Sequence, residues 1–361
     1  MDERDSYANL VLPRLLRDHG LSGRDAALAT ELAYGTLRGL GTYDAILGHC
    51  VDRPLERLDA PVRNGLRLGA HQLLGMRVPP HAAVATTVGA TRAQVGAGPA
   101  KLVNAVLRRV AERDLEAWVE ELAPHDPVER LALRHSHPAW VARAFLDALH
   151  GDLEELEACL AADNEPPAVT LVAFPGRCTV DELVAGGAQP TRWSPYGAVL
   201  PGGDPAGVPA VRERRAAVQD EGSQLVALAL AAVPLTPPVR PDNSVTRDDA
   251  AAGPDNSDER WLDSCAGPGG KAALLAGLAT ARGARLVAVE QRPQRARMVE
   301  QALADDPGDH RVVTGDGREP VPGEGPFDRV LVDAPCTGLG ALRRRPEARW
   351  RRQPSDVASL R

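Results

Sequence analysis

Apolar side chains recur at helical spacing through the first third of the chain. Leu102, Val106 and Val110 stand four residues apart, and Leu107 widens the same stripe. A stripe of this width is typical of helices that bury one face against neighbours. The pattern predicts an all-helical bundle domain over residues 1–120.

The pattern changes after residue 125. Residues 169–174 form a short β-rich run bounded by prolines and a glycine, and residues 191–200 and 211–218 are further candidate strands. Residues 224–232 are rich in alanine and leucine, which favours a helix. We therefore expect a small α+β domain over residues 125–232, which either binds RNA or links its two neighbouring domains.

Residues 234–260 consist mainly of Pro, Asp, Asn, Ser and Ala, with little to bury, and predict a disordered insert. From Trp261 onward, short apolar runs alternate with helical segments, which indicates a parallel, doubly wound, Rossmann-like sheet over residues 261–361. The predicted strands are 261–265, 285–290, 311–314 and 329–333, and the predicted helices are 271–280 and 293–303. Ligands of such sheets bind beyond the carboxyl ends of the strands.

Composition narrows the class of protein. No apolar run reaches about 18 residues, so we expect no membrane partner. Five cysteines are widely spread without a CxxC pair, which argues against zinc ribbons and disulfide frameworks and predicts a cytoplasmic protein without a metal site.

Charge is unevenly distributed on a chain whose net charge is −7. Residues 241–260 carry six acids and two arginines (−6 + 2 = −4), whereas residues 343–352 carry six arginines and one glutamate (+6 − 1 = +5). The basic run predicts RNA contacts, with arginines on phosphates and a tryptophan that offers a stacking face; the alternative is an ordinary charged helix surface. The candidates are Arg343, Arg344, Arg345, Arg349, Trp350, Arg351 and Arg352.

A glycine-rich loop joins the first predicted strand of the sheet to its helix. It reads Cys265-Ala-Gly-Pro-Gly-Gly-Lys271 and matches neither the dinucleotide fingerprint nor a P-loop. Its glycines allow the backbone to approach a ligand closely. Only two of the 42 basic residues are lysines, Lys101 and Lys271, so Lys271 is expected to need its compact ammonium group.

Three acids follow three successive strands. Glu290 is placed to accept both hydroxyls of a ribose, Asp316 to accept from an adenine amino group, and Asp333 ends the fourth strand. Each acid alone is typical of a solvated turn. Together with the glycine loop, they predict a site for a nucleotide-like cofactor.

These motifs resemble those of the RsmB/Nop family of RNA 5-methylcytosine methyltransferases, which use S-adenosylmethionine (SAM). The resemblance rests on Cys265–Lys271, on Asp333-Ala-Pro-Cys336-Thr-Gly and on four further segments, residues 78–84, 102–109, 218–224 and 340–350. It implies that the first domain is a NusB-like RNA-binding domain and that the chain methylates C5 of a cytosine in 16S ribosomal RNA. We expect the chain to act as a monomer.

The resemblance also implies residue roles. It assigns SAM binding to Cys265, Ala266, Gly267, Pro268, Gly269, Gly270, Lys271, Glu290, Asp316 and Asp333, and catalysis to Asp333 and Cys336. A thiolate that adds to C6 of cytosine makes C5 able to accept the methyl group, while Asp333 holds the N3/N4 edge. The target cytosine must be unpaired or flipped out of its stack.

The chain departs from the family pattern in one respect. The family keeps its attacking cysteine in a later Thr-Cys motif and uses the thiol matching Cys336 in product release, but no cysteine follows Cys336 here. Either the chain is C-terminally truncated, with an incomplete sheet and an unpaired apolar edge, or Cys336 itself attacks; we expect truncation.

Two other classes of protein are alternatives to this interpretation. A non-catalytic RNA-binding protein that works through the NusB-like domain predicts no SAM binding. A nicotinamide-dependent oxidoreductase fits the alternating strands but not the glycine loop or the thiol motif.

Overall fold

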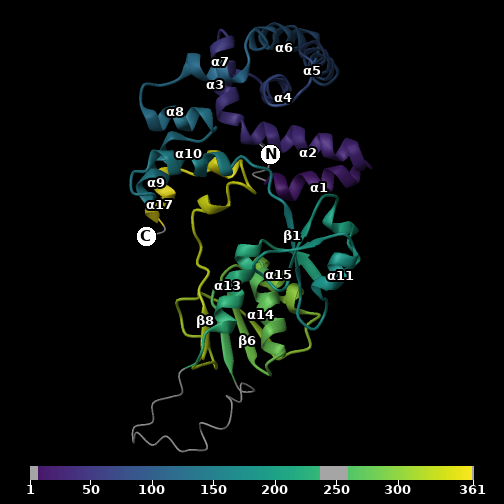
Figure 1. Ribbon diagram of the computed structural model, residues 1–361, viewed down its shortest axis with the longest axis vertical. Helices are drawn as coiled ribbons and strands as arrows, with labels where there is room; N and C mark the ends of the chain where they lie inside the picture. Colours follow the sequence, from purple (N-terminus) through teal and green to yellow (C-terminus); the bar gives the residue numbers. More distant parts are fainter. Residues whose placement is uncertain (1–6, 236–258, 360–361) are drawn as a thin grey trace, which may run out of the picture. The chain divides into compact units, whose positions relative to one another are not determined.

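The structure, a computed structural model, describes residues 7–235 and 259–359. They form two compact units, each described by itself below (Figure 1). Unit 1 comprises the chain up to Pro167 together with the segment from Thr337, and unit 2 comprises Ala168–Cys336. The expected 125–232 domain is therefore divided between the units, and residues 236–258 of the expected insert lie outside the described residues.

Unit 1 is helical, as the 3.6-residue periodicity predicts. Val106, Leu107 and Val110 of the predicted stripe are buried, and they pack with Ile46 and Leu66 in one core. Its helices are α1 (Ala8–Asp18), α2 (Gly23–Arg38), α3 (Leu40–Cys50), α4 (Ala60–Leu74), α5 (Pro80–Gln94), α6 (Ala97–Val110), α7 (Leu115–Leu122), α8 (Pro127–Arg134), α9 (Ala139–Ala148), α10 (Leu153–Ala162), α16 (Ala348–Arg351) and α17 (Pro354–Ser359).

The first sheet of unit 2 is small and antiparallel, with strand order β2-β3-β1-β4. Its strands are β1 (Val169–Ala173), β2 (Gln189–Pro190), β3 (Gly197–Leu200) and β4 (Ala216–Val218), accompanied by α11 (Val180–Ala185), α12 (Pro209–Arg212) and α13 (Glu221–Ala232). The strand expected over 211–218 is wrong in its first part, because residues 209–212 form a helical turn with proline at its start. The strand expected over 191–200 is likewise shorter, since residues 191–196 form the loop between β2 and β3.

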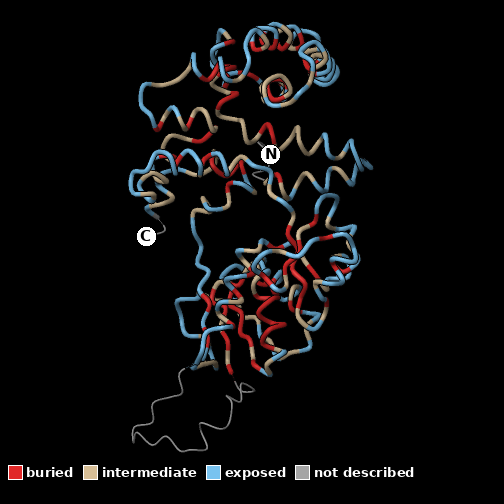
Figure 2. The backbone as a smooth tube through the Cα atoms, viewed as in Figure 1, coloured by how far each residue is buried: buried red, intermediate tan, exposed pale blue. Residues whose placement is uncertain are grey.

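The second sheet is parallel, and its strand order β7-β6-β5-β8 confirms the predicted α/β sheet. Its strands are β5 (Arg260–Asp263), β6 (Arg285–Glu290), β7 (His310–Thr314) and β8 (Arg329–Leu331), and its helices are α14 (Gly270–Thr280) and α15 (Pro293–Leu303). Trp261 of β5 lies opposite Leu286 on one side and Arg329 on the other. β5 and β6 are among the most buried parts of the molecule (Figure 2).

One apolar core joins both sheets of unit 2. Val172 of β1, Ala227 of α13, Trp261 of β5 and Leu274 of α14 all belong to it. Every residue of α14 from Ala272 to Ala279 is buried, which explains why this helix shows no polar face in the sequence.

A buried ion pair fixes the start of β8 to the start of β5. Arg329 Nε lies 2.7 Å from Glu259 Oε2, and both side chains are about one-twentieth exposed. The Trp261 indole N–H donates to the same carboxylate at 2.7 Å, and Arg329 also donates to the carbonyls of Leu230 and Val233 at the end of α13. Burial acts to raise the pKa of Glu259, but these donors hold it below its ordinary value.

Val330 of β8 and Val332, just beyond it, are exposed apolar residues. Among the described strands, β8 pairs with β5 alone, and the side chains of Val330 and Val332 are 47% and 64% exposed.

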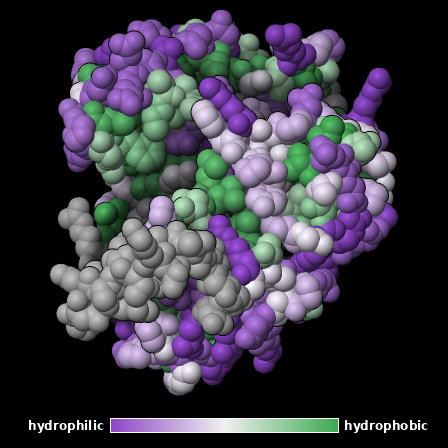
Figure 3. Space-filling view, turned by 60° about the horizontal axis from the view of Figure 1, so that its bottom comes forward, coloured by the Kyte–Doolittle hydropathy of each residue, from purple (hydrophilic) through white to green (hydrophobic). Residues whose placement is uncertain are grey.

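Hydrophilic and hydrophobic residues both lie at the surface of the molecule. Hydrophilic residues cover much of the face viewed in Figure 3, with smaller hydrophobic patches between them. Within the described ranges, no helix combines the length and the apolar character needed to cross a bilayer.

Replacing Leu274 by alanine should destabilise unit 2 by about 2–5 kcal/mol, because a fully buried leucine side chain would leave a cavity in the shared core. Urea unfolding followed by tryptophan fluorescence would measure the loss. Leu225→Ala on α13 is the matched control, since Leu225 is 36% exposed and its truncation should cost well under about 1 kcal/mol. Equal losses in both variants would contradict the assignment of Leu274 to the core.

Candidate functional site

The candidate site is built at the carboxyl ends of the four parallel strands. β5 lies between β6 and β8, so the loop that follows β5 is flanked by the segments that follow both neighbours. The glycine loop comes from β5, Glu290 from the end of β6, Asp316 from beyond β7 and Asp333 from beyond β8. The topology therefore brings together the residues that the sequence predicted separately.

Backbone hydrogen bonds fasten the glycine loop to both neighbouring strands. The Ala266 N–H donates to the Val289 carbonyl at 2.9 Å on the β6 side. On the β8 side, the N–H and the hydroxyl of Ser264 both donate to the Leu331 carbonyl at 3.0 Å. Gly269, the residue just before α14, has φ +110°, a conformation that favours glycine.

Glu290 lies directly against the loop. A methyl group added at Gly267 would overlap the Glu290 carboxylate, so a larger residue there would displace the acid from the loop. Glu290 is 6% exposed, accepts the Arg292 N–H at 2.9 Å and lies 3.7 Å from Arg295 Nε. Arg295 also donates to the Gly267 carbonyl, and so joins the acid to the loop. Sequence reasoning missed Arg295, since nothing in the local pattern of α15 distinguishes it from a solvated arginine.

Asp316 already has a partner within the described chain. Arg318 Nε and Nη2 lie 2.9 and 2.6 Å from its two oxygens, and these hydrogen bonds lower the pKa of Asp316 to about 2. Arg318 is 85% exposed, so this pair is of the weak surface type and can open. The carboxylate thus stays ionised and can accept a hydrogen bond from a ligand when Arg318 turns away.

Lys271 and Asp333 form an ion pair that links the glycine loop to the segment after β8. Their Nζ and Oδ2 atoms lie 2.6 Å apart, with the lysine side chain 20% and the aspartate side chain 52% exposed. The sequence indicated both residues but not their contact. The pair holds one oxygen of Asp333 while leaving half of the side chain open to solvent.

Asp263 is a further acid at this edge, which the list of candidate residues omitted. It ends β5, is 1% exposed, and its Oδ2 atom is buried without a hydrogen-bond partner among the described residues. Burial raises the pKa of Asp263 to about 6, against a weak bond from the Cys265 N–H at 3.4 Å. The rule that identified Glu290, an acid at a strand end, would also have found Asp263.

Cys336 differs from the other cysteines in exposure. Cys50 and Cys178 are buried, Cys159 and Cys265 are half-buried, and Cys336 is exposed at the end of unit 2. Burial raises the pKa of the Cys265 thiol, and the neighbouring Asp263 and Glu290 raise it further. Of these five thiols, Cys336 is therefore the most exposed to a substrate.

The basic run after Cys336 belongs to unit 1, and only some of its side chains are exposed to solvent. Arg349 is 0% exposed, so its expected phosphate contact is wrong. Its guanidinium donates to the carbonyls of Ser136 and Asp163 and to the side chain of Asn164, because the segment packs between helices of unit 1. Burial lowers the pKa of Arg349 to about 10.

The remaining members of the run differ in accessibility. Trp350 is half-buried against Gly41, where an added methyl group would overlap the indole, so its full ring face is not open. Arg343 and Arg345 are exposed, whereas Arg344, Arg351 and Arg352 are half-buried. Arg343 pairs with Glu165 at 3.4 Å, and the guanidinium groups of Arg345 and Arg351 stack on Tyr7.

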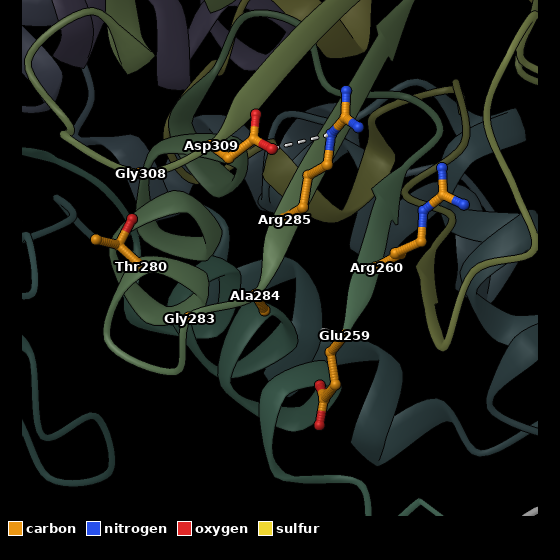
Figure 4. Close-up of a pocket in the computed structure, with 8 residues that line it drawn as sticks. All are labelled: Glu259, Arg260, Thr280, Gly283, Ala284, Arg285, Gly308 and Asp309. Carbon is orange, nitrogen blue, oxygen red and sulfur yellow. Dashed lines mark ion pairs between the residues drawn. The ribbon is translucent and has the colours of Figure 1, made fainter. Parts of the chain in front are cut away.

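A cavity of about 350 Å³ lies at the opposite, amino edge of the parallel sheet (Figure 4). It is lined by Arg260 and Arg285 at the starts of two strands, and Arg285 pairs with Asp309 at 3.5 Å. Both arginines also pair with the buried carboxylate of Glu324, at 2.5 and 2.9 Å. Parallel sheets bind ligands at their carboxyl ends, so we do not assign this cavity to a cofactor.

Comparisons with known proteins match both ends of the chain. Residues 251–361 match the model of the 16S rRNA methyltransferase RsmB/F family, and residues 1–112 match that of the NusB family. Rv1407 of Mycobacterium tuberculosis, a protein named only as a methyltransferase, is 51% identical over 99% of this chain and 74% of its own length. Ribosomal RNA small subunit methyltransferase B of Klebsiella pneumoniae is 31% identical over 99% of this chain and 77% of its own length.

A solved structure shares the fold. The crystal structure of PH0851 superimposes with a TM-score of 0.71 at 17% identity, covering 96% of this chain and 74% of that one.

The raised pKa of Asp263 predicts a pH dependence of stability. Because its folded pKa of about 6 exceeds the ordinary value of 3.8, the folded state holds the proton more tightly. The protonated Asp263 carboxyl therefore adds to the free energy of unfolding below about pH 4. This contribution, on the order of 2–3 kcal/mol, is lost as the pH rises through about 6. Urea unfolding from pH 4 to 7 should show this decline in the wild type and its absence in Asp263→Asn. A decline of the same size in Asp263→Asn would contradict the assignment.

Proposed function

Because the chain belongs to the 16S rRNA methyltransferase RsmB/F family of SAM-dependent RNA methyltransferases, we propose that it transfers the SAM methyl group to C5 of a cytosine in small-subunit ribosomal RNA. The observation that carries this proposal is the Lys271–Asp333 ion pair. It couples the loop suited to the cofactor with the segment that carries Cys336, three residues further on. We further propose that the chain acts as a cytoplasmic monomer.

The residues at the strand ends fit SAM. SAM carries ribose hydroxyls, an adenine amino group and a positively charged methionine end, and carboxylates are suitable partners for each. Glu290 would take the ribose hydroxyls and Asp316 the adenine amino group. The unpartnered oxygen of Asp263 would face a cationic group, which would also favour its ionised form. When bound, SAM supplies an electrophilic methyl group.

The chain's own groups account for the remaining chemistry. Asp333 pairs with Lys271 through Oδ2 and is half exposed, so its other oxygen can accept a hydrogen bond from the N4 amino group of cytosine and hold the ring. The exposed thiol of Cys336 is accessible to that ring. A cytosine reaches both groups only when unpaired or flipped out, which is why we propose single-stranded or distorted RNA as the substrate.

Two cysteines are candidates for the attacking thiol: one in a Thr-Cys motif, and Cys336. The resemblance gives attack to the cysteine of a Thr-Cys motif and product release to Cys336, and no cysteine follows Cys336 in these 361 residues. The alternative gives attack to Cys336. We propose the first assignment, since it is the one that the family pattern implies.

Methyl transfer from labelled SAM to unmodified small-subunit ribosomal RNA tests the function. We expect transfer by a version of the chain extended with a family-like C-terminal segment that carries the Thr-Cys motif, and little transfer by the 361 residues alone. Transfer by the 361 residues that Cys336→Ser abolishes would instead assign attack to Cys336. The absence of transfer by both versions, with RNA binding intact, would support the non-catalytic alternative.

Lys271→Ala should weaken SAM binding about tenfold, because it removes a charged hydrogen bond at the loop and frees Asp333 to move. Isothermal titration calorimetry would measure the change. Lys101→Ala is the matched control, since Lys101 is the chain's other lysine and is exposed on α6 of unit 1. Unchanged affinity in Lys271→Ala would remove Lys271 from the cofactor site.

A further inference from the structure

An exposed tryptophan stands on a short loop of the small sheet. Trp193 lies between β2 and β3 and is 62% exposed. Aromatic residues make up only 3% of the chain, and the other four tryptophans are all buried or half-buried. A large apolar ring facing water on a chain so poor in aromatics points to contact with a partner.

Arg192 stacks on this ring. Its guanidinium carbon lies 4.4 Å from the centre of the Trp193 ring, and both side chains are exposed. The stack orders the arginine through a cation–π contact, and the planar guanidinium presents its N–H donors along its edge. The two residues therefore present a flat aromatic surface and a positive donor group side by side.

The loop is fastened to the start of α13. The N–H groups of Trp193 and Ser194 both donate to Glu221 Oε1, at 2.6 and 2.9 Å. Burial works to raise the pKa of Glu221, but these backbone donors hold it below its ordinary value, so the carboxylate stays ionised at neutral pH. The Ser194 hydroxyl adds a buried bond to Gln224 at 2.6 Å. An aromatic group on a fixed backbone loses little freedom when a ligand stacks on it.

Residues 219–224, which hold the Trp193 loop, also lie beside the candidate cofactor loop. Gln219, two residues before Glu221, is 8% exposed, and its amide nitrogen would lie 3.7 Å from a methyl group added at Gly270. Gln224 donates to the Gln219 carbonyl at 3.0 Å, so the stretch of chain that holds the Trp193 loop also lies beside the start of α14. The exposed pair thus belongs to the same structural body as the strand-end site.

We propose that Trp193 and Arg192 form a stacking platform for one unpaired nucleotide of the ribosomal RNA substrate, in addition to the reacting cytosine. The indole would stack on the base and the guanidinium would contact its phosphate. Stacking of this kind is independent of sequence, because every base has a flat face. The proposal deepens the proposed function, since it rests on RNA being the substrate.

Binding of a short unstructured oligoribonucleotide tests the platform, with affinity measured by fluorescence anisotropy on the full chain. Trp193→Ala should weaken binding about tenfold, since stacking on one base contributes about 1–3 kcal/mol. Trp193→Phe should retain most of the affinity because it keeps a ring. Arg192→Gln should make the slope of log affinity against log salt concentration shallower, by the amount that corresponds to roughly one phosphate contact.

Val184→Ala on α11 is the matched control, because Val184 is another exposed apolar residue of unit 2. Thermal unfolding should show every variant folded. Unchanged oligoribonucleotide affinity in Trp193→Ala would overturn the proposal. Weaker binding to small ribosomal subunits but not to naked RNA would also overturn it, and would identify a protein as the partner.

The test separates this proposal from the proposed function. SAM affinity should be equal in the wild type and Trp193→Ala, as measured by calorimetry. If the wild type bound no SAM but Trp193 still governed RNA affinity, the methyltransferase assignment would fail and the platform would stand. If the extended version methylated RNA with the same KM in the wild type and Trp193→Ala, the function would stand and the platform would fail.

Discussion

The hydrogen-bonded position of β5 between β6 and β8 is the constraint on which the site depends. Parallel register sets Trp261 inside the core and places Asp263, two residues later, at the strand end. A shift of one residue would turn Trp261 toward the opposite face and move the glycine loop along the sheet. The buried contact of Arg329 with Glu259 and Trp261 holds this register from the side of β8. The placement of the glycine loop, Glu290 and Asp333 therefore follows from how one short strand is held.

The two ends of the parallel sheet differ in electrostatic character. At the amino edge, arginines meet carboxylates: Glu324 lies within 2.9 Å of Arg260, Arg285 and Arg311, and these contacts lower its pKa. At the carboxyl edge, Asp263 keeps a carboxylate oxygen without a hydrogen-bond partner among the described residues, and Asp333 is half exposed. Charges that are satisfied internally stabilise a fold, whereas charges left unsatisfied are suited to a ligand. Arginine–carboxylate pairs thus satisfy the charges at the amino edge, whereas Asp263 keeps an acceptor for a ligand at the carboxyl edge.

Much of this site could be predicted because its signals are local. β6 and α15 occur at the bounds that the apolar pattern and Pro293 indicated, and the acids at strand ends followed from the same pattern. What escaped prediction depends on partners distant in sequence. In the sequence, Arg349 is one member of a basic run. In the folded chain, its guanidinium donates to the carbonyls of Ser136 and Asp163, which are far from it in sequence. The pairing of Lys271 with Asp333 likewise joins positions 62 residues apart, which no local periodicity records.

Unit 1 is discontinuous in sequence, since it resumes at Thr337 after the whole of unit 2. The backbone N–H of Ala8 donates to Glu347 Oε1 at 2.7 Å across 339 positions. A ribosome moving from the amino end must therefore synthesise unit 2 completely before the last pieces of the helical core exist. During synthesis, the faces that later receive Leu342 and Arg349 stay uncovered while the sheet can already fold. Unit 2 is in this sense an insertion within unit 1, and its folding speed determines how long a nascent chain carries an unfinished helical unit.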